Sequence, residues 1–506
     1  MNSFEWTSYG SAKSLFHEIC EDDYIKEQII VSPLLKSIKK IKQQFSEDNI
    51  GSELFYQAFE FLFWIEEDLV KQKKINQRIL VLLSALLLMR KANIFGSSCI
   101  PWELLKKNIT DILLKAGLSK KDLKSSCWKK WILSSLGGNQ SIENQFSKIN
   151  IFFEKNSLIY FYKNFLLELK LGSLIMNRLK TKLSSPPKKN ILNAMKSVLE
   201  INPVSYGGEA IKLSLEQQKA LFSSITSPFL IITGGPGTGK TSLVVTLLRV
   251  LKILGFAENP ALVSPTGRAA KRMFESVYRS LNTIKNLEKL NNERELMEVA
   301  ANAKTVHRLL GYNHFTDSFK FHEFEPLDND LLIVDEGSMI DQSLMTSLLK
   351  ASNSMLTYHP PVKRIILLGD PDQLPSVGSG AVLYGLTTLP INIKRDVSKK
   401  KHLKIVKLLR NFRHNSQNSS GRNIIQVAEN VKLFPENRRL ELLFNKNHPL
   451  NQGNIQLVKN LREVVFEKVS FINQTNSMDQ LNYFANWWVE KFLSNSKFFF
   501  SNSKGI

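Results

Sequence analysis

Cysteine is scarce in this sequence, and no two cysteines lie close together. The chain has 506 residues and three cysteines, Cys20, Cys99 and Cys127, with no CxxC pair among them. This spacing indicates neither a zinc site nor a disulfide framework. We therefore expect a reducing compartment, the cytoplasm, as the location of the chain.

Long apolar runs are also missing, and no leader sequence is expected. The longest apolar run, residues 79–89, lies between Arg78 and Arg90 and is too short to cross a bilayer. We expect it to form a buried helix. The first ten residues, MNSFEWTSYG, lack a basic region followed by an apolar one, so no signal peptide is predicted.

Acidic residues are in the minority. The chain contains 68 Lys and Arg against 46 Asp and Glu, which gives a net charge of +22. A polyanion is the natural partner of such a chain, and nucleic acid fits best. Drift toward AT-rich codons would also raise the lysine content, so the charge supports a nucleic-acid partner without establishing it. The length favours two or three domains.

The first 204 residues have the pattern of a helical region. Stretches such as AFEFLFWIEEDLV and RILVLLSALLLMRKA carry apolar residues at helical spacing, and Gly96 and Pro101 separate such segments. The isolated His17 is expected to be structural. Because no catalytic cluster occurs here, we expect residues 1–204 to form an accessory domain that docks on a partner or on the rest of the chain.

A glycine-rich turn follows a run of strand-forming residues at 229–233 and precedes an amphipathic helix. The turn matches the pattern G-x-x-x-x-G-K-[ST], in which backbone N–H groups and the helix dipole surround an anion. Lys240 is expected to reach the β- and γ-phosphates, and the hydroxyl of Thr241 to bind Mg²⁺. The predicted nucleotide-binding residues are Gly234, Gly235, Pro236, Gly237, Thr238, Gly239, Lys240 and Thr241.

Strands and helices alternate from about residue 205. This alternation is typical of an α/β domain with a mostly parallel sheet and helices on both faces. Together with the glycine-rich turn it predicts a P-loop NTPase (RecA-like) motor domain, which we assign to residues 205–395.

Two adjacent carboxylates follow a second predicted strand at 331–334. Asp335 and Glu336 are expected at the end of this strand, beside the P-loop strand. Asp335 is a candidate Mg²⁺ ligand, and Glu336 a candidate base for the attacking water. Neighbouring carboxylates repel each other unless a cation relieves them, and a metal-bound nucleotide supplies that cation.

Three further residues are candidates for contacts with a nucleotide. Gln218 lies ahead of the P-loop, where its amide is able to pair with an adenine edge. Gln373 follows a third predicted strand at 364–369 and is a candidate sensor of the γ-phosphate. Arg413, in LLRNFRH, is a candidate arginine finger that neutralises charge during phosphoryl transfer.

Two segments combine hydroxyl, backbone N–H and cationic groups suited to a phosphodiester backbone. In SPTGRAAKRM, the turn residues Pro265 and Thr266 are followed by Arg268. In AKTVHRLLGY, Thr305 and His307 repeat the arrangement, and His307 would equally suit an ordinary helix surface. We predict that these five residues bind DNA.

In this order along the chain, the motifs resemble those of RecD, the alpha subunits of exodeoxyribonuclease V within the superfamily 1 helicases. The matching segments are QKA, GGPGTGKT, SPTGRAAKRM, TVHRLLG, VDEGSMID, LGDPDQLPSVGSGAVL and LLRNFRH. Upstream, LVLLSALLLMRKANIFGSSCIPWELL and NSLIYFYKNFLLE are similar to the N-terminal domain of that family.

This resemblance implies an ATP-driven motor that moves 5′ to 3′ on single-stranded DNA. The motor would use ATP and Mg²⁺ and act with RecB and RecC subunits in processing double-strand breaks. Nuclease chemistry would belong to RecB. The resemblance also implies that Gln218 contacts adenine, Gln373 the γ-phosphate and Arg413 the transition state.

The chain departs from the family pattern at two places. Gly337 stands in VDEGSMID where the family usually has Ala. The family's T-x-H-x-x-Q-G and T-R-A segments are not found in residues 414–506, so we expect 396–506 to be a partial second motor domain. Two other functions stay open: a nucleotide-binding assembly subunit that does not translocate, and a stand-alone P-loop ATPase acting on RNA or another polymer.

Overall fold

The computed structural model describes a large part of the chain. The described residues are 33–47, 55, 58, 62, 77–123, 125–134, 136–137, 149–206, 209–285, 287, 290–353, 361–388, 403–410, 412, 455–458, 469–472, 482 and 484–486. The chain divides into two compact units, one made of residues 1–235 and 240–409, the other of 236–239 and 410–506. Within the described residues, no helix has the length and apolarity needed to cross a membrane.

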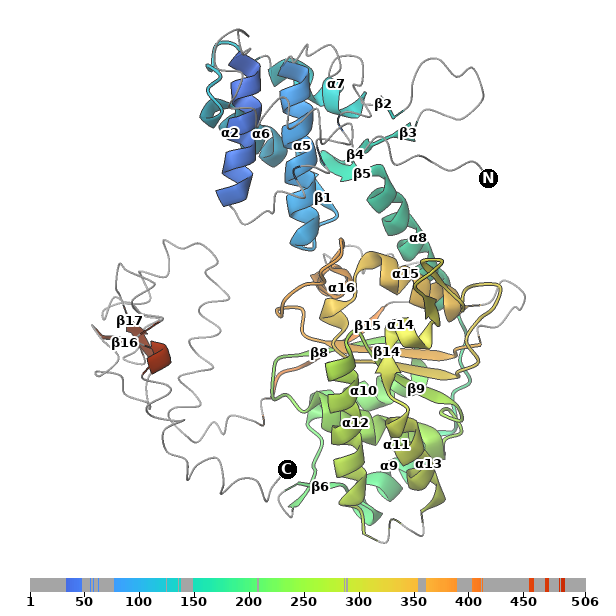
Figure 1. Cartoon of the computed structure of the whole chain (residues 1–506). Helices are drawn as coiled ribbons and strands as arrows, with labels where there is room; N and C mark the ends of the chain where they lie inside the picture. The colour runs from blue at the N-terminus through green and yellow to red at the C-terminus, as the bar shows by residue number, and fades with distance from the viewer. Residues whose placement is uncertain are drawn as a thin grey trace. The chain divides into compact units, whose positions relative to one another are not determined.

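The N-terminal region has a helical core. Its helices are α2 (Pro33–Glu47), α5 (Gln77–Ile94), α6 (Trp102–Lys115) and α7 (Trp128–Leu133), drawn in blue and cyan in Figure 1. All residues of the apolar run 79–89 are buried in α5, which confirms the expected buried helix. Because α5 has no polar face, α2, α6 and α7 pack around it and contribute Ile38, Leu105 and Trp128 to one core.

A small antiparallel sheet accompanies these helices, which differs from the purely helical region that we expected. Its strands are β1 (Cys99–Pro101), β5 (Leu158–Phe161) and β4 (Phe152–Lys155), in that order. β4 and β5 are joined by Asn156 and Ser157, whose φ angles of 52° and 62° are those of a two-residue hairpin turn. Shorter pairs are formed by β2 (Leu136–Gly137) with β3 (Ile149–Asn150) and by β6 (Ser205–Tyr206) with β7 (Glu209–Ala210).

Helix α8 (Tyr162–Leu179) leads from this sheet to the second half of the unit, where it packs along α15 (Gln342–Ala351). Near its end, the buried guanidinium of Arg178 donates hydrogen bonds to the carbonyls of Pro228, Ser352 and Val362. Burial lowers the pKa of Arg178 to about 9. The arginine therefore joins three segments that the sequence keeps far apart. Helix α9 (Lys188–Lys196) and a π-helical turn (Ser197–Ile201) follow α8.

A six-stranded parallel sheet forms the centre of the α/β region that follows α9. The strand order is β10 (Lys304–Thr305), β9 (Pro260–Ser264), β13 (Leu331–Val334), β14 (Arg364–Gly369), β8 (Phe229–Gly234) and β15 (Lys404–Leu408). Every neighbouring pair is parallel, so all six carboxyl ends lie at one edge. This confirms the predicted parallel α/β fold. β15 lies beyond the expected boundary at 395 yet pairs with β8, and the domain limits themselves stay predictions.

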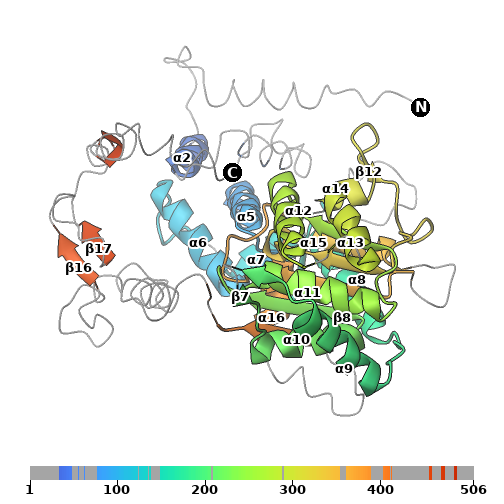
Figure 2. The same cartoon turned by 90° about the horizontal axis from the view of Figure 1, so that it is seen from below.

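Helices cover both faces of this sheet (Figure 1). One layer contains α10 (Leu215–Thr226), α11 (Lys240–Ile253), α12 (Gly267–Asn282) and α13 (Asn291–Ala301), and it faces the viewer in Figure 2. The other contains α8, α14 (Val306–Leu309), α15 and α16 (Val382–Thr388). Leu230 and Ile232 of β8 contact the first layer, whereas Phe229 and Ile231 contact the second, as strand alternation requires.

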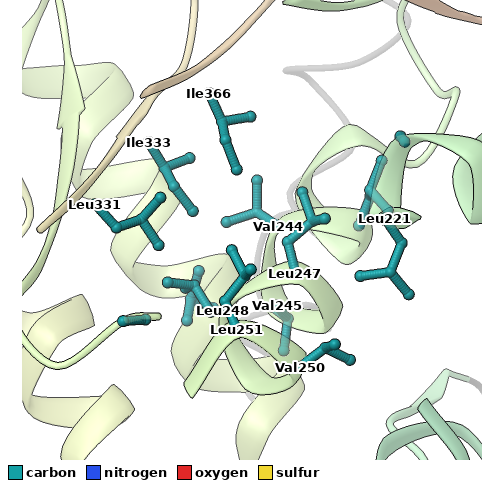
Figure 3. Packing of buried hydrophobic residues seen from close by; sticks show 14 of the residues in the cluster. Leu221, Val244, Val245, Leu247, Leu248, Val250, Leu251, Leu331, Ile333 and Ile366 are labelled. Carbon is teal, nitrogen blue, oxygen red and sulfur yellow. The ribbon is translucent and has the colours of Figure 1, made fainter. Parts of the chain in front are cut away.

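Helix α11 is the most deeply packed helix of the first layer. Its Val244, Leu247, Leu248 and Leu251 lie against apolar residues of β13 and β14 (Figure 3). Complete burial of each such side chain contributes roughly 1.5–3 kcal/mol to folding. This packing fixes the start of α11, and hence Lys240, at the carboxyl edge of the sheet.

The second unit holds one described strand pair. β16 (Ile455–Val458) and β17 (Val469–Ile472) run parallel, with Ile455 paired to Val469. The candidate Arg413 lies outside the described residues.

Candidate nucleotide site and nucleic-acid interface

The glycine-rich turn has the backbone conformation that a P-loop requires. β8 ends at Gly234 and α11 begins at Lys240, as the motif predicts. Gly237 and Gly239 have φ angles of +80° and +78°, which residues with a Cβ rarely adopt. The Lys240 ammonium donates to the carbonyl oxygens of Gly234 (2.6 Å) and Gly235 (3.3 Å). The cation is thereby held over the loop, beside the half-buried Thr241.

The two carboxylates lie at the end of β13, next to β9. The Asp335 N–H donates to the carbonyl of Val263 at 2.9 Å, and the Glu336 N–H donates to Oδ1 of Asp335 at 2.9 Å. Glu336 has a φ of 54°, in the left-handed region. Such a conformation in a residue other than glycine is costly and tends to occur at functional sites.

Burial raises the pKa of Asp335 above its ordinary value, although the Glu336 N–H and the charge of Lys240 oppose the rise. Burial and the charge of Asp335 likewise raise the pKa of Glu336, against Lys240 and Arg272. The charge of Asp370 adds to the rise at Glu336. A cation placed between the two carboxylates and the P-loop would therefore stabilise both in their ionised form.

Two glycines bring the ends of β13 and β14 close together. A Cβ on Gly337 would lie 2.6 Å from Cδ1 of Leu367 and 3.0 Å from the Leu368 carbonyl. A Cβ on Gly369 would lie 3.1 Å from the backbone nitrogen of Gly337. Because of this close packing, the charge of Asp370, at the end of β14, is near enough to raise the pKa of Glu336.

Gln373 is exposed at the same edge and is anchored by Asp370. Its N–H donates to the Asp370 carbonyl at 3.1 Å, and its side-chain amide donates to Oδ2 of Asp370 at 3.4 Å. Oδ1 of the buried Asp370 also accepts from the N–H of Asp372. The position of Asp370 directly after a buried strand is the signal in the sequence for this anchoring role.

Gln218 lies on the exposed face of α10, and its amide donates to the Leu213 carbonyl at 3.1 Å. The neighbouring Gln217 is buried and forms a capping box with Ser214 at the start of α10. The expected contact of Gln218 with adenine stays a prediction.

The two threonines predicted to bind DNA start two helices at adjacent strands. The Thr266 hydroxyl accepts from the Ala269 N–H at the start of α12, and the Thr305 hydroxyl accepts from the Arg308 N–H at the start of α14. Thr305 pairs with Ser264 in the sheet, so both hydroxyls lie at one edge. Each hydroxyl keeps its own proton for donation to a phosphate oxygen.

A cavity of about 270 Å³ lies between α12 and the segment from β10 to α14. Its lining includes the cations Lys271, Lys304 and Arg308 and the ring of Phe274. The sequence alone did not predict that Lys304 and Phe274 line this cavity, because a single lysine and an apolar helix residue do not indicate a binding site. Arg268 is exposed in the first turn of α12, and Pro265 is partly exposed just before it.

His307 is exposed and lies against a short hairpin of β11 (Tyr312–Asn313) and β12 (Ser318–Phe319). Its ring is 5.7 Å from that of Tyr312 and 5.9 Å from that of Phe319. Phe315, in the loop of this hairpin, is fully exposed. Aromatic rings in such positions offer stacking surfaces for unpaired bases.

No group of three or more His, Cys, Asp or Glu side chains suited to a metal occurs in the described residues. A Mg²⁺ ion needs only one or two carboxylates when nucleotide phosphates and water complete its shell. Thr241 and Asp335, with the charge of Lys240 acting on Asp335, fit that requirement.

The chain is similar to known proteins. The family description AAA domain matches residues 217–379. The chain is 36% identical over 258 residues to the RecBCD enzyme subunit RecD of Haemophilus influenzae, which covers 51% of this chain and 37% of the relative. Identity to the RecBCD enzyme subunit RecD of Mycolicibacterium smegmatis is 39% over 177 residues, covering 34% of this chain and 30% of the relative.

A third relative is the ATP-dependent RecD2 DNA helicase of Deinococcus radiodurans, with 37% identity over 182 residues, 36% of this chain and 21% of the relative. The matched parts span less than half the length of each of these relatives. The matches confirm the resemblance to RecD-like superfamily 1 helicases and imply ATP and a divalent metal for the P-loop domain.

Proposed function

We propose that the chain is an ATP-hydrolysing motor subunit of a RecD-like DNA helicase, translocating 5′ to 3′ on single-stranded DNA. The observation that carries this proposal is the order of groups along one edge of the sheet. The hydroxyls and cations suited to DNA phosphates follow β10 and β9, the paired carboxylates follow β13, and the P-loop follows β8. Ligands of open α/β sheets bind at this edge.

We propose that the P-loop and Asp335 bind the nucleotide and its metal. Lys240 and the loop N–H groups hold the phosphates, and Thr241 and Asp335 hold the metal, for which we propose Mg²⁺. When bound, MgATP would supply the γ-phosphoryl group that water attacks, with ADP as the leaving group. Glu336 orients that water and accepts its proton at a carboxylate whose pKa is raised by burial and by Asp335. A base with a raised pKa holds the proton better.

Three further residues complete the proposed nucleotide site. Gln373, fixed by Asp370, contacts the γ-phosphate. Gln218 contacts adenine, and Arg413 neutralises charge in the transition state.

The proposed DNA interface contacts the phosphate backbone and forms no base-specific hydrogen bonds. The proposed DNA-binding residues lie at the edge formed by β9 and β10, beside the basic cavity that Lys304 lines. They are Pro265, Thr266, Arg268, Thr305 and His307. Contacts of this kind make affinity fall steeply as salt rises, because bound counterions are released.

The three relatives described above are named RecBCD enzyme subunit RecD, in two cases, and ATP-dependent RecD2 DNA helicase. On that basis we propose RecB-like and RecC-like partner subunits, a role in double-strand break repair by recombination, and nuclease chemistry in a partner. The cytoplasm is the proposed location.

The test is ATP hydrolysis by the full chain, alone and with the partner subunits, in the presence of single-stranded oligo(dT). Lys240→Gln should abolish the DNA-stimulated rate. The matched control is Lys363→Gln, the same change at an exposed lysine at the opposite edge of the sheet. Undiminished hydrolysis and unwinding in Lys240→Gln would show that the proposal is wrong. Nucleotide binding without any turnover would instead indicate a non-translocating subunit, and a preference for RNA would indicate a stand-alone ATPase.

A further inference from the structure

The segment that carries Gln373 is held at two places. Residues 371–381 run from the end of β14 to α16, and Asp370 fixes Gln373 near the start of the segment. At its end, Gly380 has a φ of +90°, and a Cβ there would lie 2.7 Å from the side chain of Gln342. The Gln342 N–H also donates to the Ser379 carbonyl at 3.2 Å. The end of the segment is thus packed against the start of α15.

The N-terminal region supplies the second set of contacts. Helix α5 ends at Ile94, and Gly96 follows with a φ of +79°, which directs its carbonyl away from the helix. The N–H groups of Gly380 and Ala381 both donate to this carbonyl at 3.0 Å. A Cβ on Gly96 would lie 3.0 Å from that of Pro375. A glycine at a helix end therefore forms a close contact with the segment that bears Gln373.

Asn164 connects these contacts. This residue of α8 is 6% exposed, and its amide donates to Oδ1 of Asn93 at 3.2 Å. Its Oδ1 accepts from the Ser379 hydroxyl at 3.3 Å, and its backbone carbonyl accepts from the Gln342 amide at 3.2 Å. One buried residue of the N-terminal region thus bonds to the segments that follow both β13 and β14.

We propose that Asn164 is a positioning residue for Gln373, through which docking of the N-terminal region sets the rate of ATP hydrolysis. This inference rests on the proposed function. The bond from Asn164 to Ser379 and the contact at Gly96 restrict the end of the segment, while Asp370 restricts its start. With both ends held, the Gln373 amide stays at the edge of the sheet where the γ-phosphate is expected.

Loss of the Asn164 side chain leaves the P-loop intact, because Lys240 and its partners lie on β8 and α11. The binding of ADP, which has no γ-phosphate, should therefore be unchanged. The hydrolysis of ATP should slow, because a displaced Gln373 contributes only when a γ-phosphate is present. A purely structural role for Asn164 predicts the reverse, namely lower thermal stability with unchanged kinetics.

The experiment compares four variants of the full chain with the wild type: Asn164→Ala, Ser379→Ala, the double variant, and Ser352→Ala as control. Ser352 is fully buried at the other end of α15, where its hydroxyl donates to the Leu348 carbonyl. We measure kcat and KM for ATP with oligo(dT), the affinity for a fluorescent ADP, and Tm.

Asn164→Ala should lower kcat about tenfold, which equals the loss of about 1.4 kcal/mol of transition-state stabilisation. ADP affinity should stay within about twofold, a change of under about 0.5 kcal/mol. Ser379→Ala should lower kcat less, and the double variant should be no slower than Asn164→Ala, because both remove the same contact. Ser352→Ala should lower Tm and leave kcat unchanged.

An active wild type with an equally active Asn164→Ala would overturn this inference alone. Additive losses in the double variant would also overturn it, since the two residues would then act separately. A wild type without ATP hydrolysis would overturn the proposed function, and the inference with it. Because Ser379 is only partly buried, its variant keeps the test valid if Asn164→Ala fails to fold.

Discussion

Gly337→Ala introduces the residue that the RecD family usually has at this position. We expect this substitution to destabilise the chain. Gly337 lies in a short 3₁₀ turn after Glu336, and its φ is not positive, so alanine fits the backbone. In such a position the loss of unfolded-state freedom alone would stabilise the fold by about 0.4–1 kcal/mol. The new methyl group, however, would lie 2.6 Å from Cδ1 of the fully buried Leu367.

The steric cost exceeds the entropic gain. Overpacking a filled core costs about 1–3 kcal/mol, and here the Leu368 backbone carbonyl, 3.0 Å away, prevents the chain from moving aside. The net loss should be about 1–2 kcal/mol, a fall of about 1–2 °C in Tm for a unit of this size. Hydrolysis should slow as well, because Glu336 directly precedes the displaced residue.

Thermal unfolding followed by circular dichroism measures this loss, and Gly172→Ala is the matched control. A Cβ on Gly172, inside α8, meets no atom within 4 Å, so alanine there should raise stability by about 0.5–1 kcal/mol. Leu367→Ala should cost about 2–5 kcal/mol alone. The double variant with Gly337→Ala should be about 1 kcal/mol more stable than the sum of the single effects. If Gly337→Ala stabilised the chain as Gly172→Ala does, the close packing of β13 and β14 would be refuted.

Other predictions address buried charge and DNA binding. Arg178→Met should lower the free energy of unfolding by about 3 kcal/mol in urea titrations, because buried carbonyls such as that of Val362 lose their donor. Asp335→Asn should raise the Tm of the nucleotide-free chain while stopping hydrolysis. A carboxyl whose pKa is higher in the folded than in the unfolded chain destabilises the fold increasingly as the pH rises from its unfolded pKa, about 4, to its folded pKa. The Tm gap between variant and wild type should therefore widen as the pH rises above about 4, and a constant gap would contradict the raised pKa of Asp335. Arg308→Ala should reduce the slope of log K against log salt for oligo(dT) by about 0.7, and an unchanged slope would place this residue outside the interface.

Local signals in the sequence predicted the strand ends and the turn that carry the candidate nucleotide site. The P-loop between β8 and α11 and the carboxylates after β13 were predicted because a motif and its flanking strand lie within a few residues of each other. The hairpin at Asn156 and Ser157 was missed, although two aromatic-rich runs separated by two residues were its signal. Asn-Ser is not among the common dipeptides of such turns.

Long-range contacts explain the rest of what the sequence did not reveal. Asn164 and Ser379 are 215 residues apart, and Arg178 and Val362 are 184 residues apart, so no local pattern links them. The burial of Arg178 runs against the usual exposure of arginine, and only the folded chain supplies its carbonyl acceptors. The roles of Gln218, Gln373 and Arg413 stay predictions, since each depends on a bound nucleotide.

Helix α8 is bonded to the α/β region by a polar residue near each end. Asn164 and Arg178 are fourteen residues apart, which corresponds to about 21 Å along a helix. The first reaches the carboxyl edge of the sheet, and the second reaches the segments that enter β8 and β14 at the amino edge. A force on the N-terminal region would therefore act on both edges of the sheet at once. The connection that α8 makes between the two parts is rigid, because it is fixed at two points.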